Sequence, residues 1–131
     1  MKVFISSVIG GFEEYRLAAE IAIANLDHDV LRSEDFGATD VSSQVACLSA
    51  VRAADVTVVL LGERYGTPQD SELSATHEEF REARDRARLL VFEQTQVSME
   101  GAQQALLDEA REWASGVGTG TDSGSVSLAT A

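Results

Sequence analysis

An unbroken apolar run that ends in a glycine-bounded loop is the feature that most constrains how this chain can fold. Residues 56–61 are β-branched or aliphatic and show no polar alternation, which is the pattern of a strand covered on both faces of a parallel sheet. Gly62 and Gly66 bound the next loop, and they permit a tight turn because glycine tolerates backbone angles closed to other residues. Ligands bind at this carboxyl edge of open α/β sheets, so we expect the loop to contribute to a site.

Apolar periodicity predicts strands and helices that alternate along the chain. Short apolar runs indicate strands over residues 2–6, 28–33, 56–61 and 89–92, and stripes at helical spacing indicate helices over residues 12–26, 41–51, 76–87 and 102–113. This alternation predicts an α/β fold of flavodoxin-like type, a three-layer sandwich whose parallel sheet has four or five strands in the order 2-1-3-4. That order places a ligand crevice between Ser6, Ser7 and the loop at residues 62–66.

The predicted elements fit one domain and leave a polar end. A chain of 131 residues suits a single domain, and all the predicted helices and strands fall within residues 1–116. Residues 117–131 are mostly glycine, serine and threonine with scattered Val117, Val126 and Leu128, which is too little apolar surface to add to a core. We expect a flexible tail or linker there.

Charge and cysteine usage exclude some classes of function. The 22 acidic residues outnumber the 10 basic ones and give a net charge of -12, which repels nucleic acid backbones and anionic membranes. No apolar stretch approaches the roughly 20 residues that span a bilayer. The single cysteine, Cys47, rules out an internal disulfide and fits a reducing compartment. We therefore expect a cytoplasmic protein with a buried, unreactive thiol.

The two histidines do not suggest a metal site. His28 and His77 lie far apart in the pattern and lack the spacing of metal ligands. We therefore expect no metal and no required cofactor, and we predict that His77 lies on the surface of the first turn of a helix.

A pair of glutamates at the start of the third predicted helix allows two interpretations. With Thr76 as N-cap, Glu79 stands three residues on and completes a capping box, in which its carboxylate reaches back to the Thr76 N–H. Alternatively Glu79, or its neighbour Glu78, points into the crevice and acts on a ligand. One rotamer of Glu79 cannot serve both roles, so the residues alone leave the two interpretations open.

Several short motifs, taken in their order, resemble a bacterial domain of uncharacterised function. They are KVFISS at residues 2–7, FEEYR at 12–16, EDF at 34–36, the run 55–66 that ends in GERYG, and SATHEEFREA at 74–83. That domain is grouped with Toll/interleukin-1-receptor (TIR), sirtuin-like and nucleoside deoxyribosyltransferase-like domains, and it commonly stands at the N-terminus of larger signalling NTPases or repeat proteins. The resemblance covers about residues 2–116 and implies a TIR-like form of the flavodoxin-like fold.

The wider group implies cleavage or transfer at an N-glycosidic bond, in NAD or in a nucleoside, by one glutamate near the helix after the third strand. Glu79 matches best, with Ala83 four residues on as the small residue of the transferase pattern, and Glu78 is the alternative. Breaking the C1'–N bond builds positive charge on the ribose, which a carboxylate can stabilise or trap covalently.

The same analogy implies ligand contacts at the ends of the strands. Ser6 and Ser7 would meet phosphate or ribose hydroxyls, and Asp35 is a further ligand-binding candidate at this edge. In the glycine-bounded loop, Arg64 would clamp a phosphate and Tyr65 would stack on a base.

The two loop residues have plainer alternatives. Arg64 can equally form an ion pair with Glu63 or Asp35 at the sheet edge. Tyr65 can equally anchor the loop against the body of the domain. The sequence does not decide between these roles and ligand contact.

Two functions of different classes follow. We prefer a signalling or interaction module of TIR-like fold within a larger multidomain protein, which binds protein partners or itself and accepts a nucleotide ligand. The alternative is an NAD(P) hydrolase or nucleoside-processing enzyme that uses Glu79 against ribose C1'. The direction of the Glu79 side chain separates them, because burial in the crevice beside Ser6 and Tyr65 favours catalysis and a bond back to Thr76 favours a cap.

Overall fold

The chain forms a parallel sheet with helices on both faces. The computed structural model describes residues 1–36, 41–117 and 125–128. Five parallel strands lie in the order β2-β1-β3-β4-β5, with bounds β1 (Lys2–Ser6), β2 (Asp29–Arg32), β3 (Val56–Leu61), β4 (Leu89–Gln94) and β5 (Ser125–Leu128). The predicted flavodoxin-like fold and the order 2-1-3-4 of the first four strands are therefore confirmed.

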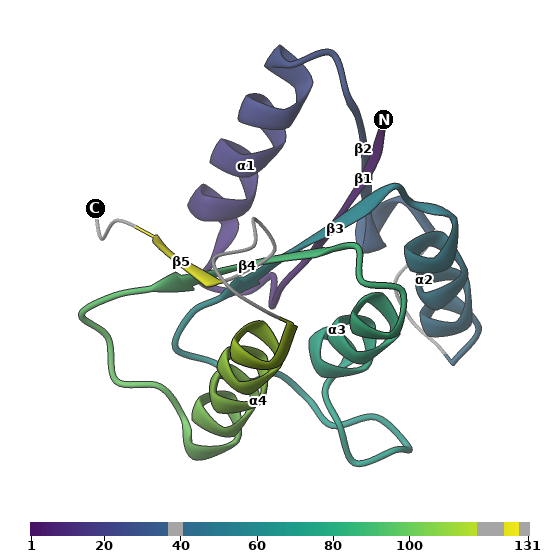
Figure 1. Cartoon of the computed structure of the whole chain (residues 1–131). Helices are drawn as coiled ribbons and strands as arrows, with labels where there is room; N and C mark the ends of the chain where they lie inside the picture. Colours follow the sequence, from purple (N-terminus) through teal and green to yellow (C-terminus); the bar gives the residue numbers. More distant parts are fainter. Residues whose placement is uncertain (37–40, 118–124, 129–131) are drawn as a thin grey trace.

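The helices make the outer layers of the sandwich. They are α1 (Glu13–Asn25), α2 (Val41–Ala53), α3 (Ala75–Asp85) and α4 (Gly101–Val117), and a 3-10 helix, η1 (Ser33–Phe36), follows β2. Figure 1 shows α1 on one face of the sheet and α2, α3 and α4 on the other. Among the described helices, none has the length and hydrophobicity needed to cross a membrane.

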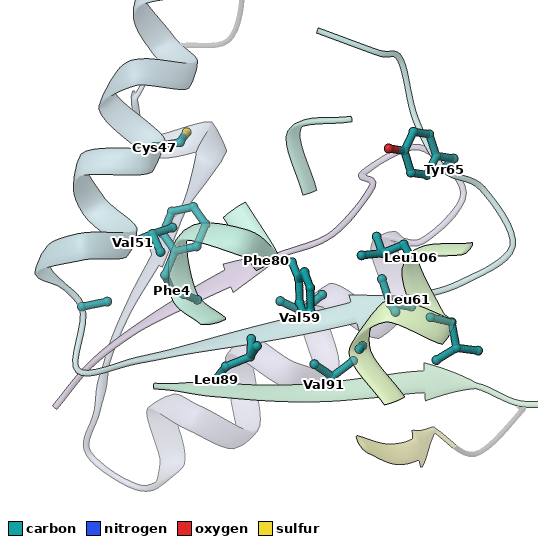
Figure 2. Close-up of a cluster of buried hydrophobic side chains, with 14 residues drawn as sticks. Phe4, Cys47, Val51, Val59, Leu61, Tyr65, Phe80, Leu89, Val91 and Leu106 are labelled. Atoms are coloured by element: carbon teal, nitrogen blue, oxygen red, sulfur yellow. The ribbon is translucent and has the colours of Figure 1, made fainter. Parts of the chain in front are cut away.

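Two apolar cores flank the central strand β3. Val59 and Leu61 face α2, α3 and α4 and pack with Phe4 and Phe80, as Figure 2 shows. The alternate residues of β3 belong to the smaller core with α1, which comprises Val3, Ile5, Phe12, Val58 and Leu60. Burial on both faces explains why β3 lacks alternating polar residues, because neither face of the strand meets solvent. Its one hydroxyl residue, Thr57, is β-branched and is itself buried.

Cys47 of α2 lies in the larger core, as predicted. Its side chain is buried, and this burial, with the charge of Glu79 as a smaller cause, raises the pKa of the thiol to about 11. The thiol is therefore protonated at physiological pH, and its place in the structure is that of a small apolar side chain.

Within residues 117–131, for which the sequence predicts a flexible tail or linker, Ser125–Leu128 form the strand β5. Ser125–Leu128 pairs in parallel with β4, with Val126 opposite Phe92. The segment alternates serine with Val126 and Leu128, a pattern typical of an edge strand, but four residues are too few for the pattern to stand out in a polar stretch. Residues 118–124 and 129–131 lie outside the described part of the chain.

Candidate functional site

The carboxyl ends of β1 and β3 and the start of α3 surround a hollow of about 280 Å³ whose wall includes Glu79. The Glu79 side chain is 3% exposed, and its Oε1 accepts a hydrogen bond of 2.6 Å from Ser6 Oγ at the end of β1. Ser6 is itself buried behind this wall. Ser7, Gln44, Thr67 and Gln69 supply other polar groups to the lining. An acidic side chain thus reaches the sheet edge at which parallel α/β folds bind ligands.

The N-terminus of α3 is capped by Ser74, so the predicted capping box between Thr76 and Glu79 is wrong. Ser74 has extended backbone angles, and its Oγ accepts from the His77 N–H at 3.1 Å. Ser74 and Thr76 both suit an N-cap, but the Ser74 N–H is bonded to the buried Tyr65 hydroxyl, a contact that lies outside the local sequence. Thr76 consequently lies inside the first turn, and Glu79 is directed toward the sheet.

Burial controls the ionisation of Glu79. Desolvation raises the pKa of its carboxyl to about 7, against the lowering effect of the Ser6 hydrogen bond, the Gln44 amide and the positive charge of Arg16. A carboxyl with a pKa near neutrality is divided between its protonated and ionised forms at physiological pH. Strongly shifted pKa values of this kind concentrate at functional sites.

Arg16 is a member of the site that the sequence analysis did not identify as functional. Its side chain is 3% exposed; it donates to Ser7 Oγ at 2.8 Å and pairs with Glu34. The signal was its position four residues after Phe12, on the face of α1 that turns inward. Ser7 Oγ also donates to the Val8 carbonyl, so the hydroxyl of Ser7 is engaged on both sides while the residue lines the hollow.

Tyr65 anchors the loop after β3, and it also lines the hollow. It is 8% exposed, and its phenol oxygen accepts from the Ser74 N–H at 3.1 Å and contacts His77 Nδ1 at 2.7 Å. The prediction that His77 lies on the surface is wrong. The residue is buried, and its Nε2 lies 3.1 Å from Oε1 of Glu109 on α4. In Figure 2 Tyr65 stands at the loop end of the larger core.

Arg64 projects at the boundary between two hollows. Its guanidinium donates to the Gly10 carbonyl at 3.3 Å, and among the described residues no carboxylate lies within ion-pair distance of it, so the alternative pairing with Glu63 or Asp35 is wrong. Arg64 lines both the hollow at Glu79 and a neighbouring one of about 290 Å³ beside Phe12. Arg64 therefore contributes its positive charge to the lining of both hollows.

The structure separates two other candidates from this hollow. Asp35 accepts from the backbone and guanidinium of Arg32, each at 3.0 Å, and is not part of the hollow's lining. Glu78 accepts from Ser71 Oγ and Gln44 Nε2 and lines a different hollow beside α2. Of the two glutamates, Glu79 is the one beside Ser6. No group of three or more potential metal ligands occurs in the described ranges.

Two solved structures share this fold. One is a 2-deoxyribosyltransferase from the psychrotolerant bacterium Bacillus psychrosaccharolyticus, with a TM-score of 0.56 and 16% identity over 82% of this chain and 81% of that one. The other is a 2-desoxiribosyltransferase from Leishmania mexicana, with a TM-score of 0.52 and 19% identity over 70% of this chain and 63% of that one. At these identities the likeness concerns the fold.

Sequence comparison places the chain in a family. A search of curated proteins finds no match. The family model described as Domain of unknown function (DUF4062) matches residues 2–114, which include every strand from β1 to β4 and all the residues of the hollow described above. The chain therefore belongs to the DUF4062 family.

Proposed function

We propose that this domain is a nucleoside-processing enzyme that cleaves or transfers at the N-glycosidic bond, with Glu79 as the nucleophile. The observation that carries the proposal is the buried Glu79 carboxyl, held by Ser6 at the wall of a polar hollow. The fold shared with two deoxyribosyltransferases supports the same reaction class. The signalling-module interpretation depended on likeness to TIR domains, and neither of these two neighbours is one.

The reaction divides into two displacements at C1' of the sugar. In the first, a Glu79 oxygen forms a bond to C1' as the C1'–N bond breaks. The electron pair of the C1'–N bond leaves with the nitrogen of the base, and that nitrogen takes up a proton. In the second, water or another base attacks C1' and releases the Glu79 carboxylate, and the attacking group loses a proton. This is the course of a retaining glycosidase, and the Ser6 hydroxyl keeps the carboxylate in place throughout.

The burial of Glu79 suits this role in two ways. A carboxylate in a low-dielectric setting interacts strongly with the positive charge that develops on the sugar. Only the ionised form is a nucleophile, and the pKa of Glu79 is raised to about 7 by burial. Turnover should therefore increase as the pH rises through neutrality.

The lining of the hollow favours a ligand with little negative charge. Its polar side chains are chiefly uncharged hydroxyls and amides, which suit sugar hydroxyls, and among its described residues Arg64 is the one cation. The net charge of -12 further opposes polyanionic ligands. We therefore place nucleosides ahead of dinucleotides such as NAD as substrates.

The test is to incubate the purified protein with 2'-deoxynucleosides, ribonucleosides and NAD, each with and without a free acceptor base. Chromatography should detect released base or a new nucleoside, at low and at high protein concentration because self-association remains a prediction from the sequence. Glu79→Gln should lower the rate by about 10³-fold or more. The matched control Glu78→Gln should stay within about threefold of the wild type, since Glu78 lines a different hollow.

Two results would overturn the proposal. One is a wild-type protein that releases no base from any member of the panel at any concentration, which would favour an interaction module instead. The other is a Glu79→Gln variant as active as the wild type, which would remove Glu79 from the chemistry.

A further inference from the structure

A series of hydrogen bonds, buried at Tyr65 and His77, runs from the loop after β3 to Glu109 of α4. Tyr65 Oη and His77 Nδ1 are 2.7 Å apart, and His77 Nε2 lies 3.1 Å from Glu109 Oε1. His77 is 5% exposed, and its ring meets that of Tyr65 edge to face. The proposed reaction makes no use of this series, although Tyr65 lines the hollow at Glu79.

The groups at the two ends limit how these hydrogen bonds can run. The Ser74 N–H can only donate, so Tyr65 Oη accepts from it at 3.1 Å, and the phenol keeps its own proton, which it can direct to His77 Nδ1, 2.7 Å away. The Glu109 carboxylate can only accept, so His77 Nε2 carries the proton. In the arrangement tested below, Tyr65 donates to His77 Nδ1 and His77 Nε2 donates to Glu109.

Both ends of this series are held firmly. Glu109 accepts from Arg81 Nε at 3.0 Å and from Arg84 Nη1 at 3.0 Å. Burial acts to raise the pKa of Glu109, but the hydrogen bonds from Arg81 and His77 outweigh burial and lower that pKa. At the other end, the Tyr65 N–H donates to Glu100 Oε1 at 2.8 Å. A carboxylate on α4 that two arginines hold in place therefore contacts His77 and, through it, Tyr65.

The hydrogen bonds of Tyr65 and His77 also hold the start of α3, the helix that carries Glu79. Tyr65 bonds to Ser74, the N-cap of α3, and His77 donates its backbone N–H to the Ser74 hydroxyl. Glu79 follows two residues after His77 on the same helix. Any rotation of the loop or of the first turn of α3 would therefore move the Glu79 carboxyl relative to Ser6.

We infer that His77 is a positioning residue, which uses the Glu109 carboxylate to hold Tyr65 and the first turn of α3 so that Glu79 stays buried against Ser6. The catalytic consequence rests on the proposed function, whereas the state of the His77 ring does not. The experiment therefore has a spectroscopic arm that needs no turnover.

The first arm determines the protonation of the ring by nitrogen NMR of labelled protein at about pH 8. His77 should show a protonated Nε2 and an unprotonated Nδ1, and Tyr65→Phe should shift the Nδ1 resonance because that nitrogen loses its donor. His28, whose Nδ1 faces the N-terminal amine, is the internal reference and should not change. A protonated Nδ1 in His77, or a resonance unaffected by Tyr65→Phe, overturns the inference.

The second arm follows the carboxyl carbon of Glu79 by NMR titration. In Tyr65→Phe and His77→Leu, the loosened loop should admit water and lower the midpoint by about half a pH unit or more. His77→Asn keeps an acceptor near the position of Nδ1 and should preserve most of the wild-type midpoint, as should His28→Asn. Unchanged midpoints in both Tyr65→Phe and His77→Leu overturn the inference, and Tyr65→Phe decides the matter if His77→Leu does not fold.

Kinetics complete the design if the wild-type protein turns over a nucleoside. Loss of positioning should lower kcat about tenfold in Tyr65→Phe with KM nearly constant, because the interaction acts on the geometry of Glu79 and not on binding. A rise in KM alone would contradict a positioning role. If no substrate is turned over, the proposed function fails, and the two NMR arms still decide the state of His77.

Discussion

Ser6 Oγ lies 2.6 Å from Glu79 Oε1, joining the end of β1 to α3 across 73 positions of sequence. Both residues are buried, so each loses contact with water when the hydrogen bond between them forms. A carboxyl in that setting is costly to ionise, and a hydroxyl that donates to it offsets part of the cost. The stability and the pH response of the domain should both depend on this contact.

Replacing Glu79 by glutamine should stabilise the protein at alkaline pH. The folded pKa of Glu79 is raised to about 7 from the ordinary 4.5, so the folded state binds more protons than the unfolded state between these values, and stability falls as the pH rises through them. Above that window the ionised carboxyl costs on the order of 3 kcal/mol. Glutamine removes this cost and can still accept from Ser6.

Urea denaturation of both proteins across the pH range measures this difference. The two curves should coincide below about pH 4.5, separate as the pH rises and run parallel above about pH 8. Glu78→Gln should show no such separation. A Glu79→Gln variant that is less stable than the wild type at high pH would mean that the carboxylate gains more from its partners than burial costs it.

Removing the Ser6 hydroxyl should raise the pKa of Glu79 and so shift its titration to higher pH. The Ser6 hydrogen bond lowers the pKa of Glu79, so Ser6→Ala leaves desolvation less opposed and raises that pKa further. The carboxyl titration should shift to higher pH, and any turnover should reach half its maximum at higher pH. Ser49→Ala, on the exposed side of α2, is the control. A shift to lower pH in Ser6→Ala would contradict the observed hydrogen bond.

The sheet was predictable from the sequence because its central strands have a local pattern. The apolar runs at residues 2–6 and 56–61 coincide with β1 and β3. β5 escaped prediction because four residues of alternating serine and aliphatic side chains carry little signal without their partner strand. The N-cap of α3 escaped prediction because Ser74 and Thr76 are locally equivalent, and it is the contact of Ser74 with Tyr65 that distinguishes them in the structure.

Site residues are harder to identify from the sequence when their burial depends on an element distant in the chain. Ser6, Ser7, Arg64, Tyr65 and Glu79 come together because strand ends in a parallel sheet share one edge. Arg16 and His77 are buried by contacts with η1 and α4, and neither contact is visible in the local sequence. Asp35 follows β2 as predicted, but its carboxylate is already paired with the guanidinium of Arg32.

Cys47 should resist thiol reagents in the folded protein. Burial raises the pKa of its thiol to about 11, so at about pH 8 only on the order of one molecule in a thousand carries the reactive thiolate. A disulfide reagent should label the folded protein slowly and label one thiol per chain at once after denaturation in urea. Rapid labelling of the folded protein would show that α2 opens readily from the core.

Gly62 should not tolerate a side chain, whereas Gly101 should. A Cβ at Gly62 would come 2.6 Å from Phe12 Cε1 and 3.2 Å from Gln94 Oε1, and the Phe12 ring is buried and stacked on Tyr15, so it cannot swing away. Gly62→Ala should cost about 1–3 kcal/mol in urea denaturation. Gly101 begins α4 with open space around it, so Gly101→Ala should be neutral or gain up to about 1 kcal/mol. Equal stabilities for the two variants would mean that the loop after β3 does not press against Phe12.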